Sequence, residues 1–348
     1  MIEKIIPSGR EKVNRSAEAE AGREERREEV GIYIGADGGG TGTTLAACEN
    51  GRRIAEARTG PLNYRFIPAE DAVRNLLEGI DGLGIAPRRI SALGIADPSL
   101  DDAAGERDEA AARFYGLLRE ALPYPVFGRS DAYITLFGLK CGFDGGTNTP
   151  AALILSGTGA MGIAENAQGE IRVAGGWGRL TGDEGSGWFI AVEGIRAALR
   201  ADDGIGEKTT LGNALLNRFG GGRTSLRELI PVFYGDPEPE IAAFAEDVAR
   251  CAEEGDAVSF AILDEAARFL ALYAAELVRF SEAKTVGIYG SVLTKNRTVR
   301  EGFEKRLWDA CGDGIRVTVP TFPAEEAAAR YAEAEAMTAN GKGQEDPS

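Results

Sequence analysis

The stretch "GIYIGADGGGTGTT", residues 31–44, runs from a short apolar segment through Asp37 into three consecutive glycines and a segment with three threonines. Glycine inside a regular element costs roughly 0.5–1 kcal/mol relative to alanine, so this run is unfavourable unless the backbone must approach a ligand closely. Backbone N–H groups and hydroxyls in such a turn can surround a phosphate. The residues expected to do so are Gly38, Gly39, Gly40, Thr41 and Thr43; an ordinary glycine-rich hairpin is the alternative.

The surrounding sequence excludes two familiar phosphate-binding motifs. It contains neither the GxxxxGK[ST] pattern of a P-loop nor a GxGxxG that opens a helix. Instead, two more strand-like segments follow at residues 43–49 and 52–58, with a turn at Asn50-Gly51 between them. This pattern predicts an antiparallel three-stranded meander.

The composition limits the possible functions. A chain of 348 residues is predicted to form two domains, because single cores stop growing near about 250–300 residues. No apolar run approaches the ~18 residues of a membrane span, and a net charge of −16 disfavours nucleic acid as a partner. The sequence contains no histidine, so any general base is expected to be a carboxylate.

The cysteines and the first segment favour a cytoplasmic location. Cys48, Cys141, Cys251 and Cys311 are far apart and form no CxxC pair, so we expect core thiols rather than a zinc site or disulfides. Residues 1–30 mix basic and acidic side chains with few large apolar ones and lack a secretory signal. We predict that they form a disordered leader.

The plan of the first half is repeated in the second. Residues 151–175 again read as strand, glycine turn and two more strands. The turn "LSGTGA" supplies Ser156, Gly157, Thr158 and Gly159. We therefore predict an α/β fold of two similar domains, residues 31–142 and 143–323, that face each other across a cleft, with a flexible tail over 338–348.

Two aspartates are candidates for chemistry at this cleft. Asp37 ends the first strand beside the glycine loop, where phosphates would repel it unless Mg²⁺ lay between them; a turn-capping role is the alternative. Asp131, in "FGRSDAYITLFG", lies at a strand-to-helix junction. The sequence favours an N-cap there, and the competing role is that of the base that takes a proton from an attacking hydroxyl.

The segment "GGWGRLTGDEGSGWF", residues 175–189, is typical of a sugar site. Tryptophan faces stack on sugar rings, and aspartate oxygens accept hydrogen bonds from hydroxyls. Tryptophans buried in the core of glycine-rich turns are the alternative.

Together these segments resemble the N-acetylglucosamine kinase group and the related BadF/BadG-type ATPases of the sugar kinase, Hsp70 and actin superfamily. The resemblance runs from Gly31 to about Ala336, and the segment 175–189 is its most specific part. It implies two ribonuclease H-like, or actin-like ATPase, domains across a nucleotide cleft, with a helix at about 324–337 that completes the first domain. It also suggests homodimers.

The resemblance further implies ATP-dependent phosphorylation of an amino sugar at its 6-hydroxyl. Asp37 would hold Mg²⁺, and Asp131 would activate the hydroxyl. Gly39, Thr41 and Thr158 would contact the nucleotide phosphates, and Gly290 and Ser291, in "YGSV", would border the adenosine. The sugar would be surrounded by Asn63, Gly176, Trp177 and Asp183.

Three departures from the family pattern bear on the substrate. Ala160 stands where the animal enzyme has a sugar-contacting serine, "GIADPSL" lacks an Ala-Gly, and "PAEEAAARYA" lacks a Gly-Ala. The alternatives are a reductase-activating ATPase, which needs clustered cysteines for an iron–sulfur centre, and a sugar-responsive regulator, which needs a DNA-binding module. A degenerate member that binds ATP weakly is a third.

Overall fold

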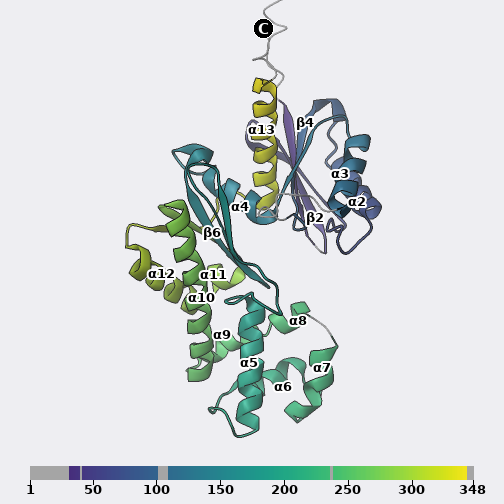
Figure 1. Ribbon diagram of the computed structural model, residues 1–348. Coiled ribbons are helices and arrows are strands. Elements are labelled where there is room, and N and C mark those ends of the chain that lie inside the picture. The colour runs from purple at the N-terminus through teal and green to yellow at the C-terminus, as the bar shows by residue number, and fades with distance from the viewer. Residues whose placement is uncertain (1–30, 40, 101–108, 236–237, 343–348) are drawn as a thin grey trace, which may run out of the picture.

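Two five-stranded sheets organise the chain in the computed structural model, which describes residues 31–39, 41–100, 109–235 and 238–342 (Figure 1). The first sheet has the order β3-β2-β1-β4-β5 and the second the order β10-β9-β6-β7-β8. The strands of the first are β1 (Ile32–Gly38), β2 (Thr43–Glu49), β3 (Arg52–Thr59), β4 (Ile90–Ala96) and β5 (Val126–Arg129). Those of the second are β6 (Ala151–Ser156), β7 (Ala160–Glu165), β8 (Ile171–Gly175), β9 (Thr285–Tyr289) and β10 (Arg316–Thr318).

The two sheets are built in the same way. In each, the first three strands form an antiparallel meander, and the last two pair in parallel beside its first strand. The predicted α/β fold with a repeated meander is therefore confirmed.

Helices cover both faces of the first sheet. One face packs against α2 (Ala69–Gly82), which also contacts α3 (Glu109–Ala121), and the other packs against α13 (Ala324–Lys342). Strand β4 is buried along almost its whole length, as its continuous apolar sequence predicts for a strand covered on both sides. Figure 1 shows α13 beside the first strands, so the first strand and the last helix of the described chain pack against each other.

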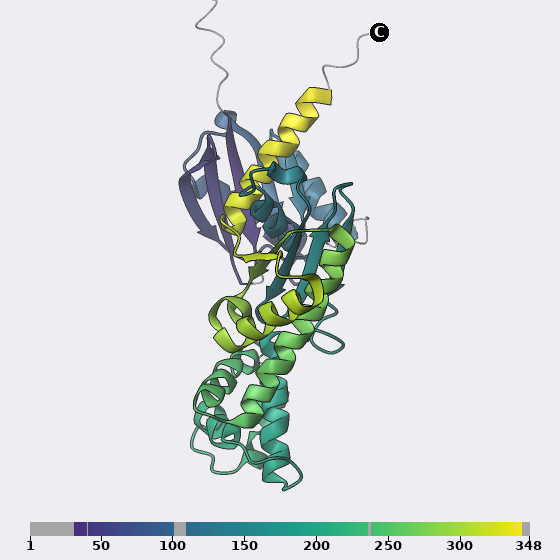
Figure 2. The ribbon, with the colours of Figure 1, turned by 90° about the vertical axis from the view of Figure 1, so that its left-hand side faces the viewer.

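The remaining helices connect and extend the second sheet. Helix α4 (Asp131–Lys140) contacts α13 as well as β6 and β7, so it joins the two halves. Helices α10 (Ala257–Ser281) and α11 (Ser291–Lys295) contact the second sheet, and α12 (Arg297–Cys311) packs against α10. Figure 2 shows the other helices extending away from the second sheet. They are α5 (Gly187–Asp202), α6 (Leu211–Phe219), α7 (Ile230–Tyr234), α8 (Glu238–Ala242) and α9 (Ala245–Glu253).

Two strand glycines let α13 approach the first sheet closely. A Cβ atom on Gly35 would lie 1.9 Å from the carbonyl oxygen of Glu325, and one on Gly94 would lie 2.0 Å from that of Ala328. The helix presents buried alanines to these positions. Glycine inside a strand is explained here by the approach of another backbone.

The C-terminal boundary differs from the sequence prediction. Helix α13 continues through residues 338–342, which the prediction assigned to the tail. The predicted leader, residues 1–30, lies outside the described residues. All four cysteines are free, and Cys48 and Cys251 are buried as core thiols. No described helix combines the length and the apolar character needed to cross a membrane.

The close approach of α13 predicts opposite effects of two glycine substitutions. Gly35→Ala should destabilise the protein by about 1–3 kcal/mol, the usual cost of overpacking. Gly116→Ala, in the middle of α3 with open space around its Cβ position, should stabilise it by about 0.5–1 kcal/mol. Urea unfolding measures both, and a Gly35→Ala protein as stable as the parent would contradict this packing.

Candidate active site

The carboxyl ends of β1, β4 and β5 lie at one edge of the first sheet and carry acidic residues. Asp37 pairs in register with Ala96, and Ala96 pairs with Arg129. Asp97 follows β4 directly, and Asp131 follows β5 after one intervening residue. This edge is where open α/β sheets place their ligands.

Residues from both sheets lie near this edge, as the pKa shifts of Asp37 and Tyr289 indicate. Burial, followed by the charges of Asp131 and Glu325, raises the pKa of Asp37 from its ordinary 3.8 to about 6. Glu325 lies in the first turn of α13. At the end of β9 in the other sheet, burial followed by the charges of Asp37, Glu325 and Asp131 raises the pKa of Tyr289. We call Asp37, Asp131 and Glu325 the acidic cluster.

The prediction that Asp131 caps its helix is wrong. Ser130 is the N-cap of α4, and its hydroxyl oxygen accepts a hydrogen bond from the backbone N–H of Tyr133 at 3.0 Å. Asp131 is the first helical residue, and its Oδ1 accepts from the N–H of Ala132 at 2.8 Å. Because the serine provides the cap, the aspartate is not required for it.

The first glycine loop is tied to the segment that follows β3. The N–H of Gly39 donates to the carbonyl of Gly42 at 2.9 Å, and the carbonyl of Gly39 accepts from the N–H of Leu62 at 3.3 Å. Thr43 is buried, and its hydroxyl donates to the carbonyl of Gly60 at 2.8 Å. Its hydroxyl therefore supports the turn, whereas Thr41 is exposed and Gly40 lies outside the described residues.

The second glycine loop is held against the start of α5. The N–H of Gly187 donates to the carbonyl of Gly157 at 2.7 Å, and the N–H of Trp188 donates to that of Thr158 at 3.1 Å. The hydroxyl of Ser156 is buried and donates to the carbonyl of Gly185 at 2.8 Å. The backbone of this loop is thus fixed by contacts on one side.

The other side of this loop opens into a cavity of about 390 Å³. Gly157, Thr158 and Ser291 line it together. Gly290 has φ +91°, and a Cβ there would lie 2.3 Å from the carbonyl oxygen of Ser156, so only glycine fits this contact. The fold thus brings the "LSGTGA" and "YGSV" segments to one cavity.

The far wall of this cavity was not predicted. It consists of one face of α8 and α9 and of the residues after Ser291, namely Ala242, Ala243, Ala245, Glu246, Ala249, Arg250, Glu253, Lys295 and Asn296. The alanines read as an ordinary helix, so the sequence gives no signal for them. Lys295 lies one helical turn after Ser291 in α11, so its position next to the "YGSV" segment could have indicated that it lines the same cavity.

The predicted sugar residues lie on two loops. In the second half, the N–H of Gly176 donates to the carbonyl of Ala160 at 3.1 Å, and the N–H of Ala160 donates to Oδ1 of Asp183 at 3.4 Å. Asp183 is buried with φ +59°, a backbone conformation uncommon outside glycine. Trp177 is 77% exposed, so the core alternative is wrong for it. In the first half, Asn63 follows Leu62 directly.

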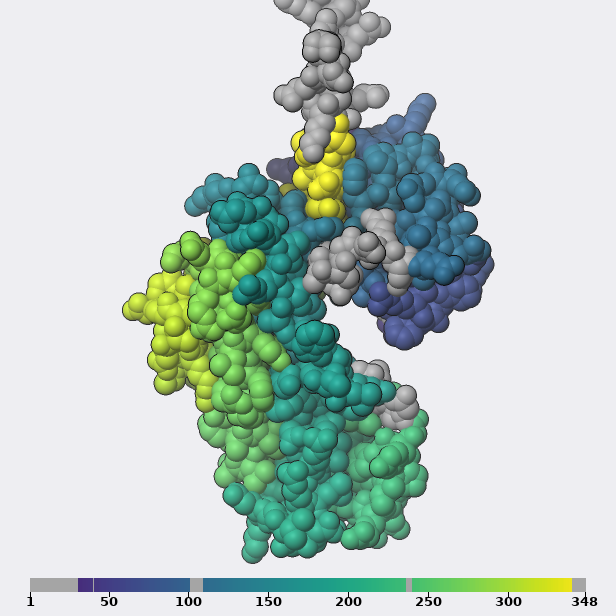
Figure 3. Space-filling model, viewed as in Figure 1, coloured from purple at the N-terminus to yellow at the C-terminus, as the bar shows by residue number. Residues whose placement is uncertain are grey.

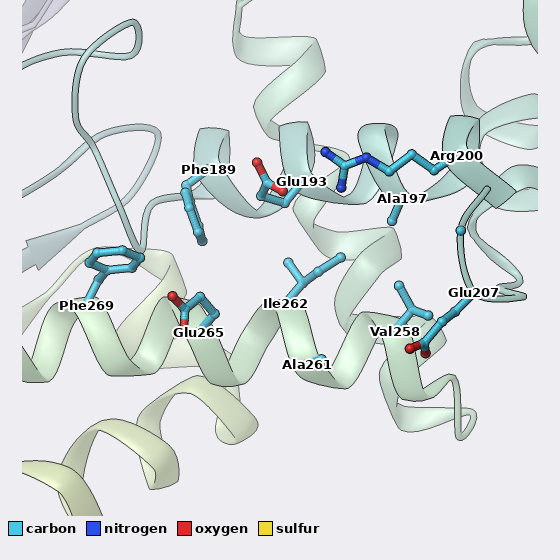
Figure 4. Close-up of a pocket in the computed structure, with 11 residues that line it drawn as sticks. Phe189, Glu193, Ala197, Arg200, Glu207, Val258, Ala261, Ile262, Glu265 and Phe269 are labelled. Carbon is cyan, nitrogen blue, oxygen red and sulfur yellow. The ribbon is translucent and has the colours of Figure 1, made fainter. Parts of the chain in front are cut away.

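A second cavity, of about 520 Å³, lies away from these loops. Figure 4 shows Phe189 and Glu193 on α5 facing Ile262, Glu265 and Phe269 on α10. Neither glycine loop and no member of the acidic cluster lines it.

Residues 34–324 match the model of the BadF/BadG/BcrA/BcrD ATPase family. The chain belongs to this family. It is 32% identical, over 79% of its length and 89% of the relative's, to an N-acetylmuramic acid/N-acetylglucosamine kinase of Clostridium acetobutylicum. It is 30% identical, over 69% of its length and 76% of the relative's, to an N-acetyl-D-glucosamine kinase of Dictyostelium discoideum.

A solved structure has the same fold as this chain. A candidate N-acetylglucosamine kinase of Chromobacterium violaceum superposes with a TM-score of 0.67, at 23% identity over 87% of this chain and 99% of that one. The resemblance that the sequence predicts is therefore confirmed.

The acidic cluster fits a magnesium ion that is held mostly by water and ligand phosphates. Among the described residues, no group of three or more His, Cys, Asp or Glu side chains is arranged to hold a metal ion. Mg²⁺ bound with nucleotides takes one or two protein carboxylates and keeps several waters. Burial, followed by repulsion from Asp131 and Glu325, raises the pKa of Asp37, and a cation bound there would offset both effects.

The raised pKa of Asp37 predicts how the stability of the protein depends on pH. Since its pKa is about 6 in the folded protein and 3.8 ordinarily, the folded state binds more protons between about pH 4 and 6, and stability falls as the pH rises through that window. Asp37→Asn removes this loss. Without nucleotide or Mg²⁺, we expect its Tm at pH 7 to rise by roughly 2–4 °C, which about 1 kcal/mol produces in a large domain.

The comparison with pH 4 and with a surface residue makes this test specific. The Tm difference between Asp37→Asn and the parent should vanish near pH 4, where Asp37 is protonated. Asp144→Asn, at an exposed position after α4, should show no such pH dependence. A Tm gain of equal size at both pH values would contradict the role of the Asp37 charge.

Proposed function

We propose that this protein transfers the γ-phosphoryl group of ATP to the 6-hydroxyl of an amino sugar, N-acetylglucosamine or glucosamine. One observation carries the proposal. Asp37 and Asp131 interact at the edge of the first sheet with Tyr289, the residue that leads through Gly290 into the cavity lined by Thr158 and Ser291. The residues that we propose as proton acceptor, cation ligand and phosphate loop would thus act at one junction.

The comparisons support the reaction class. The relatives from Clostridium acetobutylicum and Dictyostelium discoideum are both kinases of N-acetylated sugars, and the family is one of ATPases. The predicted enzyme class, an ATP-dependent sugar kinase, is confirmed. The hydroxyl that is phosphorylated and the choice of amino sugar belong to the proposal.

We propose the domain arrangement that this reaction requires. Residues 31–142, completed by α13, and residues 143–323 would each form a ribonuclease H-like domain, and the nucleotide would lie in the cleft between them. The identical strand order of the two sheets supports this division. Figure 3 shows a hollow in the surface between the elements of the first sheet and the helices below it.

The residues would divide the chemistry as follows. Gly38, Gly39 and Thr41 from one loop, and Gly157, Thr158 and Gly159 from the other, would surround the phosphates, with Gly40 predicted to join them. Mg²⁺ near Asp37 would neutralise phosphate charge. Asp131 would accept the proton of the sugar hydroxyl while its oxygen attacks the γ-phosphorus, and ADP would leave with the bridging oxygen.

The acceptor would lie between the two loops described above. Asn63 would contact it from the first half, and Gly176, Trp177 and Asp183 from the second. The exposed face of Trp177 supports a stacking role, because a tryptophan with that much exposed surface is available to a sugar ring. A cytoplasmic location and a homodimer stay predictions.

The structure offers no support for the iron–sulfur alternative. The four cysteines are free, and the described residues hold no cluster of metal-ligating side chains.

Asp131→Asn tests the proposed base. Loss of general-base catalysis should lower kcat by about 10²–10⁴-fold while the ATP dissociation constant stays within about twofold. ADP release over a panel of N-acetylglucosamine, glucosamine and glucose measures the rate, and ³¹P NMR of the product identifies the hydroxyl. Asp144→Asn should match the parent. Full turnover by Asp131→Asn would exclude the role, and a parent protein inactive on every sugar would refute the proposed function.

The cavity beside Thr158 predicts a selective effect on ATP. Ala249→Trp places a large side chain into this cavity, so the KM for ATP should rise by at least about tenfold, equivalent to about 1.4 kcal/mol, with the sugar KM unchanged. Ala197→Trp fills the other cavity in the same way and should leave the KM for ATP unchanged. Equal effects of the two substitutions would contradict the nucleotide assignment.

A further inference from the structure

A buried carboxylate that the sequence analysis did not select lies behind Asn63. Asp97 is 0% exposed. Its Oδ2 accepts hydrogen bonds from the hydroxyls of Tyr64 at 2.8 Å and Tyr115 at 3.0 Å, and its Oδ1 accepts from the N–H of Ser99 at 2.9 Å. Burial raises the pKa of Asp97, and these hydrogen bonds oppose the rise. Such a carboxylate is costly to bury, so its donors hold it in a defined position.

Asp97 connects two parts of the candidate site. Through the Ser99 N–H it fixes the residue whose hydroxyl donates to Oδ1 of Asn63 at 2.8 Å. Its own backbone N–H donates to the carbonyl of Arg129 at 2.9 Å, just before the N-cap of the helix that begins with Asp131. One residue therefore ties the Asn63 loop to the strand that places the proposed base.

These contacts decide which way the amide of Asn63 faces. Its Oδ1 also accepts from the backbone N–H of Arg65 at 3.2 Å. Because a backbone N–H can only donate, the atom that faces it must be the amide oxygen rather than the nitrogen. Within the described part of the chain, the amide nitrogen has no hydrogen-bond partner. Both acceptor positions of the oxygen are occupied, so Asn63 offers a ligand only N–H donors.

We propose that Asp97 and Ser99 are positioning residues that orient Asn63 so that its amide N–H groups donate to an oxygen of the acceptor sugar. The group that Asn63 reads is then a hydroxyl or carbonyl oxygen, because an ammonium group has no lone pair to accept such a bond. This inference rests on the proposed kinase function. It assigns acceptor selectivity to a buried pair that does not contact the sugar.

A double-mutant cycle between Ser99 and Asn63 tests the inference. Ser99→Ala removes the hydroxyl that holds the amide, so we expect the KM for the acceptor sugar to rise by roughly 3–10-fold, the usual effect of one hydrogen bond. The KM for ATP should not change. Asn63→Ala should raise the acceptor KM at least as much, and the double variant should be no worse than Asn63→Ala alone, since Ser99 acts only through Asn63.

Ser281→Ala is the matched control. Ser281 is also buried, and its hydroxyl donates to a carbonyl, that of Leu277, at 2.7 Å inside α10. The two serine variants should lose similar stability in thermal unfolding, and only Ser99→Ala should change the acceptor KM. Equal KM values for the two serine variants, or additive effects of Ser99→Ala and Asn63→Ala, would overturn the inference.

Asp97→Asn tests whether Asp97 orients Asn63 or only stabilises the fold. An amide nitrogen in place of Oδ2 cannot accept from the hydroxyls of Tyr64 and Tyr115, so both charge-assisted hydrogen bonds are lost. Tm should therefore fall, and the acceptor KM of the folded fraction should rise at least as much as in Ser99→Ala. A lowered Tm with a parental acceptor KM would make Asp97 purely structural and overturn its role. A parent protein that phosphorylates no amino sugar would end the proposed function and this inference together, whereas an active parent with an additive cycle would end the inference alone.

Discussion

The burial of Asp37 beside two other carboxylates is the constraint around which the site is built. Asp37, Asp131 and Glu325 come from a strand end, a helix start and the first turn of α13, and the fold holds them near one another at a cost that is visible in the raised pKa of Asp37. Glu325 is partly compensated by Arg53 at 3.3 Å. In the proposed function, a divalent cation that arrives with a nucleotide would offset the charge of Asp37.

Helix α4 connects the acidic cluster to the second sheet. Asp131 is its first residue, and Lys140 is its last. Lys140 is 2% exposed and forms an ion pair with Glu165 of β7 at 2.9 Å. Glu165 is the last residue of β7, the strand that follows the second glycine loop, so one helix and one ion pair connect the proposed base to the second sheet. Buried pairs contribute little net stability, but removing one partner is costly, so this connection is well suited to fixing a register.

The elements that the sequence predicts correctly are those with local signals. Glycine turns and alternating or continuous apolar runs suffice to predict both meanders and the strand over residues 90–96. The cap at α4 was assigned to the wrong residue because Ser130 and Asp131 are adjacent and both are good caps. The far wall of the cavity beside Thr158 was missed because alanine-rich helices carry no chemical signature. These errors arise where a residue's role depends on its neighbours in space.

Asp97 shows why part of the site is invisible in the sequence. Its two tyrosine donors lie 33 and 18 positions away along the chain, so no local pattern predicts them. The hydrogen bonds of Asp97 become evident only when β4, the Asn63 loop and α3 are packed together. A buried strand followed by an aspartate does not by itself predict these partners.

Two of the departures from the family pattern have physical explanations in the structure. Ala160 contributes its backbone N–H and carbonyl to Asp183 and Gly176, so these backbone contacts of the loop do not depend on the side chain at this position. The segment "GIADPSL" contains Asp97 and Ser99, the residues that orient Asn63 from behind. The first departure leaves the backbone of its loop intact, and the second lies in the support of Asn63. Because a hydrogen bond weakens when its donor shifts, the proposed positioning of Asn63 makes the second departure the one expected to affect acceptor selectivity.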